Sequence, residues 1–147
     1  MNRLLLVLLL FLAGEGAALA CSCIRPPTDP AQQRTHAREI AKGAVALVEV
    51  ELAAPYDERS GRGERLRVRR TLAGRAPAVF EVERHHAPSS ASCDVEFERG
   101  IRTWLVLYAP RIRDRTVRYR VSASCTGHML AGAAFRSELA AQMGRRR

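Results

Sequence analysis

Hydrophobic and polar residues alternate over several short stretches in the middle of the chain, and each stretch predicts a β-strand. The first has apolar residues at every second position, with glutamates between the later ones: Ala46, Val48, Val50 and Leu52. Residues 53–63 are polar and rich in turn-forming types, which predicts a long exposed hairpin loop. The second strand alternates Leu66, Val68 and, further on, Leu72 with polar residues. The alternation breaks at Arg70, where we expect the strand to bulge or end.

Three further strands are predicted downstream. Phe80 and Val82 share one face of the third strand, with glutamates on the other. Residues 104–108 are apolar on both faces, which predicts a central strand that is covered on both sides. The chain is expected to turn over residues 110–114, and a fifth strand follows over 117–121.

A helix is expected before the strands and another after them. Thr28 or Asp29 is suited to cap a first helix with Pro30 in its first turn. This helix is expected to run from Ala31 to about residue 41, and Gly43 ends it. A short amphipathic helix near the C-terminus is indicated by three apolar residues at helical spacing: Phe135, Leu139 and Met143.

These elements predict a mainly β fold. Short strands with turn signals between them favour a small barrel or sandwich. The strand count fits a five-stranded antiparallel barrel of the oligonucleotide/oligosaccharide-binding type, with a flanking N-terminal helix and a short C-terminal helix.

The first twenty residues have the pattern of a secretory signal peptide. Arg3 supplies the positive charge, residues 4–13 are apolar, and Ala18-Leu19-Ala20 fits a cleavage site. We therefore expect residues 1–20 to be removed and residues 21–147 to form one secreted domain, extracellular or periplasmic. A membrane anchor is disfavoured because the apolar run is too short to span a bilayer. Lipidation of Cys21 is a more serious alternative than an anchor, but secretion is favoured over it because lipidation would leave an odd number of cysteines.

The chain is strongly basic. It has 24 lysine and arginine residues against 15 aspartate and glutamate residues, and its formal net charge is +9. A basic secreted protein can bind anionic surfaces such as acidic glycans or lipopolysaccharide, and an ordinary solvated surface is the simpler explanation. The arginines of two strands are candidates for such a surface: Arg65, Arg67, Arg69, Arg118 and Arg120. Nucleic acid is disfavoured, because the chain is exported and has few aromatic residues to stack on bases.

The four cysteines are Cys21, Cys23, Cys93 and Cys125. Cys21 and Cys23 cannot easily bridge each other, since one intervening residue makes a strained ring. Each then needs a distant partner, and such a bridge stabilises the fold by about 4 kcal/mol in the entropic model. A four-thiolate zinc site is less favoured because Cys93 and Cys125 are not closely spaced. A thiol enzyme using Cys125 and His128 is disfavoured further.

The sequence resembles the N-terminal domain of the tissue inhibitors of metalloproteinases, in the netrin-module superfamily. The resemblance rests on Cys21-Ser22-Cys23 directly after the cleavage site and on residues 87–93, Ala-Pro-Ser-Ser-Ala-Ser-Cys. It extends to Gly100, to the apolar strand at 104–108 and to Cys125 after the last strand. The leader and the composition are of bacterial type, so the chain would be a short bacterial form of the family.

The resemblance implies the disulfides Cys21–Cys93 and Cys23–Cys125 and a free N-terminus at Cys21. In this family, the amine and carbonyl oxygen of that residue chelate the catalytic zinc of a metalloprotease. Ser22 would then enter the pocket beside the zinc. The chain from Cys23 through Ile24 to Arg25 would follow the substrate groove. The loop that contains Pro88, Ser89 and Ser90 would form the second part of a rigid wedge.

We therefore expect a secreted, monomeric inhibitor of a zinc metalloprotease. It is expected not to be an enzyme and to need no cofactor of its own, because the zinc belongs to the target. The alternative is a netrin-like module without inhibitory activity that binds anionic surface components through its arginines.

Overall fold

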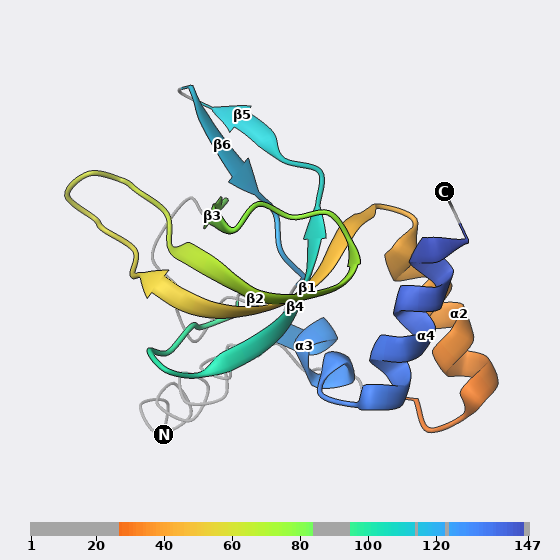
Figure 1. The fold of residues 1–147 in the computed structure, drawn as a ribbon. Coiled ribbons are helices and arrows are strands. Elements are labelled where there is room, and N and C mark those ends of the chain that lie inside the picture. Colours follow the sequence, from red (N-terminus) through yellow and green to blue (C-terminus); the bar gives the residue numbers. More distant parts are fainter. Residues whose placement is uncertain (1–26, 84–94, 114, 123, 146–147) are drawn as a thin grey trace, which may run out of the picture.

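The computed structural model describes residues 27–83, 95–113, 115–122 and 124–145 (Figure 1). Their elements follow in the order α2 Pro30–Ala41, β1 Ala44–Ala54, β2 Arg65–Gly74, β3 Val79–Val82, β4 Arg102–Tyr108, β5 Arg111–Arg113, β6 Thr116–Tyr119, α3 Ser124–Leu130 and α4 Ala133–Gly144. The fold is thus mainly β, with a helix ahead of the strands and two after them. These positions confirm the predicted N-terminal and C-terminal helices.

The strands form one mixed sheet rather than the expected five-stranded antiparallel barrel. Its order is β4-β1-β2-β3-β6-β5. All neighbours are antiparallel except β3 and β6, which are parallel and pair through Glu81 with Arg118 and Val82 with Tyr119. The prediction failed because β3 is only four residues long and takes its second neighbour from far along the chain.

The sheet is not closed into a barrel, but its two sides meet at one point. Residues just beyond β6 approach β4, where Leu107 and Val121 form an isolated bridge. Beside it, the backbone N–H of Tyr108 donates to the carbonyl of Arg120 at 3.0 Å, and that of Ser122 donates to the carbonyl of Val106 at 3.0 Å. In the strand order, however, β4 lies at one end, so the prediction that it is a central strand is wrong. Its burial was nevertheless predicted, since Leu105, Val106 and Leu107 are fully buried.

Irregular pairing between β1 and β2 accounts for the broken alternation near Arg70. Glu49 pairs with Arg70 while Val50 pairs with Val68, so Arg69 is left as an extra residue on β2. This is a β-bulge, as the sequence pattern predicted.

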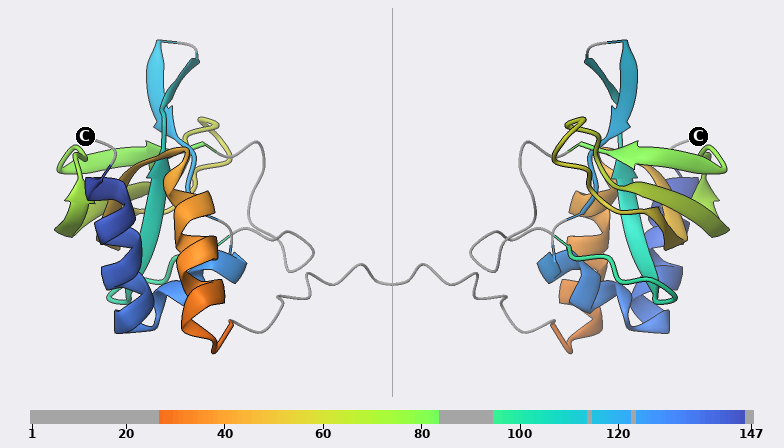
Figure 2. Two further views of the ribbon diagram at one scale, coloured as in Figure 1. Left: turned by 90° about the vertical axis from the view of Figure 1, so that its right-hand side faces the viewer. Right: turned by 90° about the vertical axis from the view of Figure 1, so that its left-hand side faces the viewer.

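Helices α2 and α4 pack against each other and lie over the same side of the sheet, as Figures 1 and 2 show. Asp29 caps α2: its side chain accepts hydrogen bonds from the backbone N–H groups of Ala31 and Gln32, and Pro30 fills the first helical position. Residues 124–130 form α3, which the sequence analysis did not predict.

Two hydrophobic clusters lie on the two faces of the sheet. The first, which we call the helix-side cluster, has the buried members Ala37, Ala41, Leu47, Val106, Leu130, Phe135, Leu139 and Met143. The second, the sheet-interior cluster, comes entirely from strands: Ala46, Val48, Val50, Leu66, Phe80, Val82, Leu105 and Leu107. β1 and β4 contribute to both clusters, which explains why both strands are apolar on both faces.

Candidate functional site

The candidate inhibitory residues lie outside the described residues. They are Cys21, Ser22, Cys23, Ile24 and Arg25 at the expected mature N-terminus, and Pro88, Ser89 and Ser90 in the loop before Cys93. The signal peptide, residues 1–20, also lies outside them. The backbone of Cys125 falls within α3, but the predicted disulfides Cys21–Cys93 and Cys23–Cys125 involve side chains that are not described. What the structure does describe is how the body holds the residues that flank these segments.

The chain that follows the N-terminal segment is attached to α2. The side-chain amide of Gln33 donates to the carbonyl of Pro27 at 2.9 Å. Two residues later, Asp29 caps the helix at distances of 3.3 and 3.0 Å from the amides of Ala31 and Gln32. Pro27 is therefore fixed to a helix whose buried residues, Ala37 and Ala41, belong to the helix-side cluster.

The residue before the second segment, Glu83, is held between two strands. Its backbone N–H donates to the carbonyl of Tyr119 at 2.8 Å, which extends the parallel pairing of β3 with β6. Its carboxylate forms an ion pair with Arg111 at 3.4 Å, and only 8% of its side chain is exposed. Residues 84–94 thus start from a position that is fixed by the backbone and by a charge pair.

The residues after the second segment pack into the sheet. Val95 and Phe97 are half-buried against the sheet-interior cluster. The backbone N–H of Ile101 donates to the carbonyl of Glu98 at 3.3 Å, and the turn that includes Gly100 then leads into β4. The described residues on both sides of the segment 84–94 are therefore attached to the sheet.

Ser122 fixes the chain just before α3 and Cys125. It is 2% exposed, and its hydroxyl accepts a hydrogen bond from the backbone N–H of Val106 at 3.2 Å. Its own N–H donates to the Val106 carbonyl, so one serine satisfies both backbone groups of a β4 residue. The start of α3 is consequently held against β4.

Of the five arginines that the sequence suggests as a site for anionic surfaces, two form ion pairs with glutamates. Arg69 binds Glu51 at 2.7 Å, and this hydrogen bond lowers the pKa of Glu51 and raises that of Arg69. Arg118 is paired with Glu81 at 2.7 Å. Arg65 and Arg67 are exposed, as is Arg120, whose guanidinium lies 5.7 Å from the ring centre of Tyr108. The five arginines therefore do not form one free cationic face.

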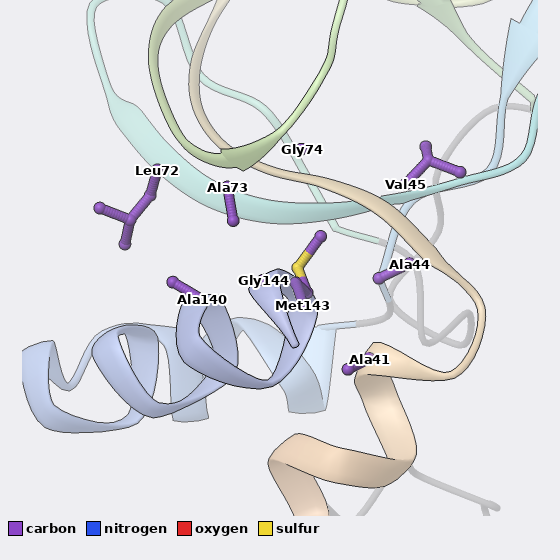
Figure 3. Close-up of a pocket in the computed structure, with 9 residues that line it drawn as sticks. All are labelled: Ala41, Ala44, Val45, Leu72, Ala73, Gly74, Ala140, Met143 and Gly144. Atoms are coloured by element: carbon purple, nitrogen blue, oxygen red, sulfur yellow. The ribbon is translucent and has the colours of Figure 1, made fainter. Parts of the chain in front are cut away.

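An apolar groove of about 360 Å³ lies between the C-terminal ends of α2 and α4 and strands β1 and β2 (Figure 3). Small side chains line most of it: Ala41, Ala44, Val45, Leu72, Ala73, Gly74, Ala140, Met143 and Gly144. No lining residue is titratable, so the groove has no group for acid–base or nucleophilic chemistry. Among the described residues, no group of three or more histidine, cysteine, aspartate or glutamate side chains could hold a metal ion.

The hairpin that β5 and β6 form was not predicted from the sequence. A turn is expected there over residues 110–114, and a strand over 117–121. Instead, residues 111–113 form β5, and two aliphatic side chains of the hairpin are exposed, Ile112 at 79% and Val117 at 48%. The arginine on each side of Ile112 was the available signal, because it gives residues 111–113 the alternation of a strand.

Comparison of the chain with protein-family models, with curated proteins and with solved structures finds no match. Within the described ranges, no helix is both long and apolar enough to cross a membrane.

Proposed function

We propose that the protein is a secreted inhibitor of zinc metalloproteases that acts through a free N-terminal Cys21. The observation that carries the proposal is the anchoring of both candidate segments. Pro27 is tied to α2, while Glu83 and Val95 tie the ends of the second segment to the sheet. Fixing the residues that flank a binding segment lowers the conformational entropy that the segment can lose on binding, so such anchoring favours tight inhibition.

The chemistry of a chain end with a free amine suits this role. A catalytic zinc keeps one coordination position for water, and the amine and carbonyl oxygen of Cys21 can displace that water as a chelating pair. An α-amine has an unperturbed pKa near 8. The metal therefore deprotonates it at modest cost near neutral pH. Ser22 then points into the adjacent pocket, and Cys23, Ile24 and Arg25 follow the substrate groove.

The disulfides Cys21–Cys93 and Cys23–Cys125 are part of the same proposal. The first would join the N-terminal residue to the loop that contains Pro88, Ser89 and Ser90. The second would join Cys23 to α3, next to the position where Ser122 is bonded to β4. We also propose that the sheet is a partly open barrel of the oligonucleotide/oligosaccharide-binding type. The bridge between Leu107 and Val121 supports this assignment.

The decisive experiment adds one alanine before Cys21. Protein that begins at Cys21 is expected to inhibit members of a panel of zinc metalloproteases, and the extended protein is expected to lose that inhibition. The added residue moves the amine away from the zinc and leaves a peptide nitrogen, which does not chelate, in its place. Equal potency of the two proteins, or no inhibition by either, contradicts the proposal.

Two controls make the result specific. Equal urea midpoints for the two proteins show that the added alanine acts on the chain end and not on the fold. The intact mass must correspond to a start at Cys21 and to the loss of four hydrogens from the four cysteines.

A Ser22→Gly variant retains the chelating atoms, so it is expected to change the ranking of the proteases in the panel and to keep inhibition.

A further inference from the structure

The hairpin of β5 and β6 extends from the body of the protein on the side away from α2 and α4 (Figures 1 and 2). Arg111 pairs with Arg118 and Ile112 pairs with Val117 in its antiparallel register. Opposite residues in a pair point to the same face, so Ile112 and Val117 form a cross-strand apolar pair. Both are strongly exposed, at 79% and 48% of their surface.

The apolar face of the hairpin continues an interior face of the sheet. Tyr119, the last residue of β6, lies two residues after Val117 and on the same side of the strand, and it packs edge-on against Phe80 with ring centres 5.4 Å apart. Tyr119 is half-buried against the sheet-interior cluster. Ile112 and Val117 extend this face beyond the part that the sheet covers.

The opposite face and the turn of the hairpin are cationic. The sequence from 111 to 120 has arginine at five positions and one aspartate: Arg111, Arg113, Asp114, Arg115, Arg118 and Arg120. Arg111 has 61% of its side chain exposed even though it is paired with Glu83. Arg115 and Arg120 are also exposed. The hairpin is therefore amphipathic, because its uncovered aliphatic pair lies on the same hairpin as the exposed arginines Arg111, Arg115 and Arg120.

The base of the hairpin is rigid. Arg118 is paired with Glu81 at 2.7 Å and is only 17% exposed, and Arg111 is paired with Glu83. These contacts, together with the ring packing of Tyr119, hold β6 against β3 and tie β5 to Glu83, the residue that follows β3. Ile112 and Val117 lie beyond these contacts and are exposed.

From this geometry we propose that the β5–β6 hairpin binds anionic phospholipid membranes. The two aliphatic side chains enter the boundary between headgroups and acyl chains, while the arginines attract the phosphates. Neither contribution is strong alone, and reversible membrane binding commonly combines an apolar group with basic residues.

Other partners fit the hairpin less well. Addition of a protein strand to β5 is disfavoured, because the strand is three residues long and has an arginine at each end, as edges that resist pairing do. An acidic polysaccharide would use the arginines and leave the exposed pair Ile112 and Val117 without a role. The lipid bilayer is the partner that uses both faces. This inference is independent of protease inhibition.

The test measures binding of the full chain to vesicles by flotation at physiological salt. Wild-type protein is expected to bind vesicles of equal parts phosphatidylcholine and phosphatidylglycerol, and to bind pure phosphatidylcholine vesicles much more weakly. The double variant Ile112→Ser/Val117→Ser is expected to bind the anionic vesicles at least about tenfold more weakly, since burial of two aliphatic side chains is lost. Ile112→Trp is expected to strengthen binding, because tryptophan favours the membrane interface.

Matched controls separate the hairpin from the rest of the surface. Ile101 is 54% exposed elsewhere in the molecule, and Ile101→Ser is expected to leave binding unchanged. Neutralising Arg115 and Arg120, with Arg115→Asn to suit its φ of 60°, is expected to weaken binding by about tenfold or more. Neutralising the exposed β2 pair with Arg65→Gln/Arg67→Gln removes the same charge and is expected to have a much smaller effect.

Several results overturn the proposal. These are no binding of wild-type protein to anionic vesicles, full binding by the Ile112→Ser/Val117→Ser variant, or unchanged binding by Ile112→Trp. Equal losses from the hairpin and β2 arginine variants indicate diffuse charge attraction and also overturn it. Retention of the serine variant on heparin is expected to match the wild type, and a parallel loss there contradicts a role of the apolar pair in lipid binding.

Discussion

The helix-side cluster and the sheet-interior cluster hold different parts of the molecule. The helix-side cluster takes only Leu47 and Val106 from the sheet, and its other buried members come from helices. The sheet-interior cluster contains strand residues only. Pro27 is attached to α2 and so depends on the first cluster, whereas Val95 and Phe97 pack on the second. The described residues that flank the two segments of the proposed inhibitory wedge therefore depend on different clusters.

Removing one buried leucine from each cluster is the most direct test of whether the two clusters stabilise different parts of the molecule. Leu47 on β1 and Leu66 on β2 are both fully buried. Leu47→Ala and Leu66→Ala are each expected to lower the free energy of unfolding by about 3 kcal/mol, from lost burial and a residual cavity. Urea unfolding measures the loss.

Hydrogen exchange then distinguishes the two variants. In Leu47→Ala, amides of α2 and α4 are expected to lose protection first, because the sheet contributes few other residues to the helix-side cluster. In Leu66→Ala the larger loss is expected at residues 95–101. Identical exchange changes in both variants mean that the two clusters act as one unit.

Gly74 lines the apolar groove, and replacing it tests how closely the backbones of β1 and β2 approach each other there. Its φ is +83°, and an added Cβ would lie 2.0 Å from the carbonyl oxygen of Val45. Gly74→Ala is expected to cost about 2 kcal/mol in unfolding free energy, because the left-handed backbone and the contact both oppose a side chain. Gly100 has a similar φ of +79° and nothing within 4 Å, so Gly100→Ala is the matched control and is expected to cost less.

Asp29 caps α2, so its replacement is expected to affect the helix-side cluster and not the sheet-interior cluster. Asp29→Ala is expected to lower the unfolding free energy by about 1 kcal/mol, because two amides of α2 lose their cap. Asp29→Asn retains a capping oxygen and is expected to cost less. Thermal unfolding measures both variants, and equal midpoints for alanine and asparagine contradict the capping role.

The smallest effect is expected from an ion pair between β1 and β2. The hydrogen bond from Arg69 holds the pKa of Glu51 below its ordinary value of 4.5. A depressed carboxyl pKa contributes stability above the unfolded-state pKa, and this contribution is lost as pH falls through the folded-state pKa. Wild-type protein is therefore expected to lose stability below about pH 4.5 more steeply than Glu51→Gln. Urea midpoints measured from pH 7 to pH 3 check this, and parallel curves contradict it.

Local signals predicted the elements better than their arrangement. Asp29 and Pro30 located the start of α2, because N-terminal capping depends on neighbouring residues. Alternation of apolar and polar residues likewise located β1 and β2, even though it breaks near Arg70. The parallel pairing of β3 with β6 depends on contacts between distant segments, which alternation does not encode. The seven residues of α3 are too few to show a helical period.

The candidate site divides in the same way. Sequence motifs nominated Cys21 and residues 88–90, and their role stays a prediction. The structure added what the sequence did not contain, namely the attachment of their flanks and the exposed pair Ile112 and Val117. The exposure of Ile112 and Val117 was not predicted, because alternation shows which residues share a face of a strand. It does not show whether another part of the fold covers that face.

The only tryptophan of the chain, Trp104, is placed to act as an internal optical probe. The guanidinium carbon of Arg136, at the start of α4, lies 4.9 Å from its ring centre, and that of Arg70 on β2 lies 5.9 Å away. Separation of the helices from the sheet would remove the Arg136 contact and admit water to the indole. Its emission would then shift to longer wavelength while the strands were still paired, so unlabelled protein can report the order in which its layers separate.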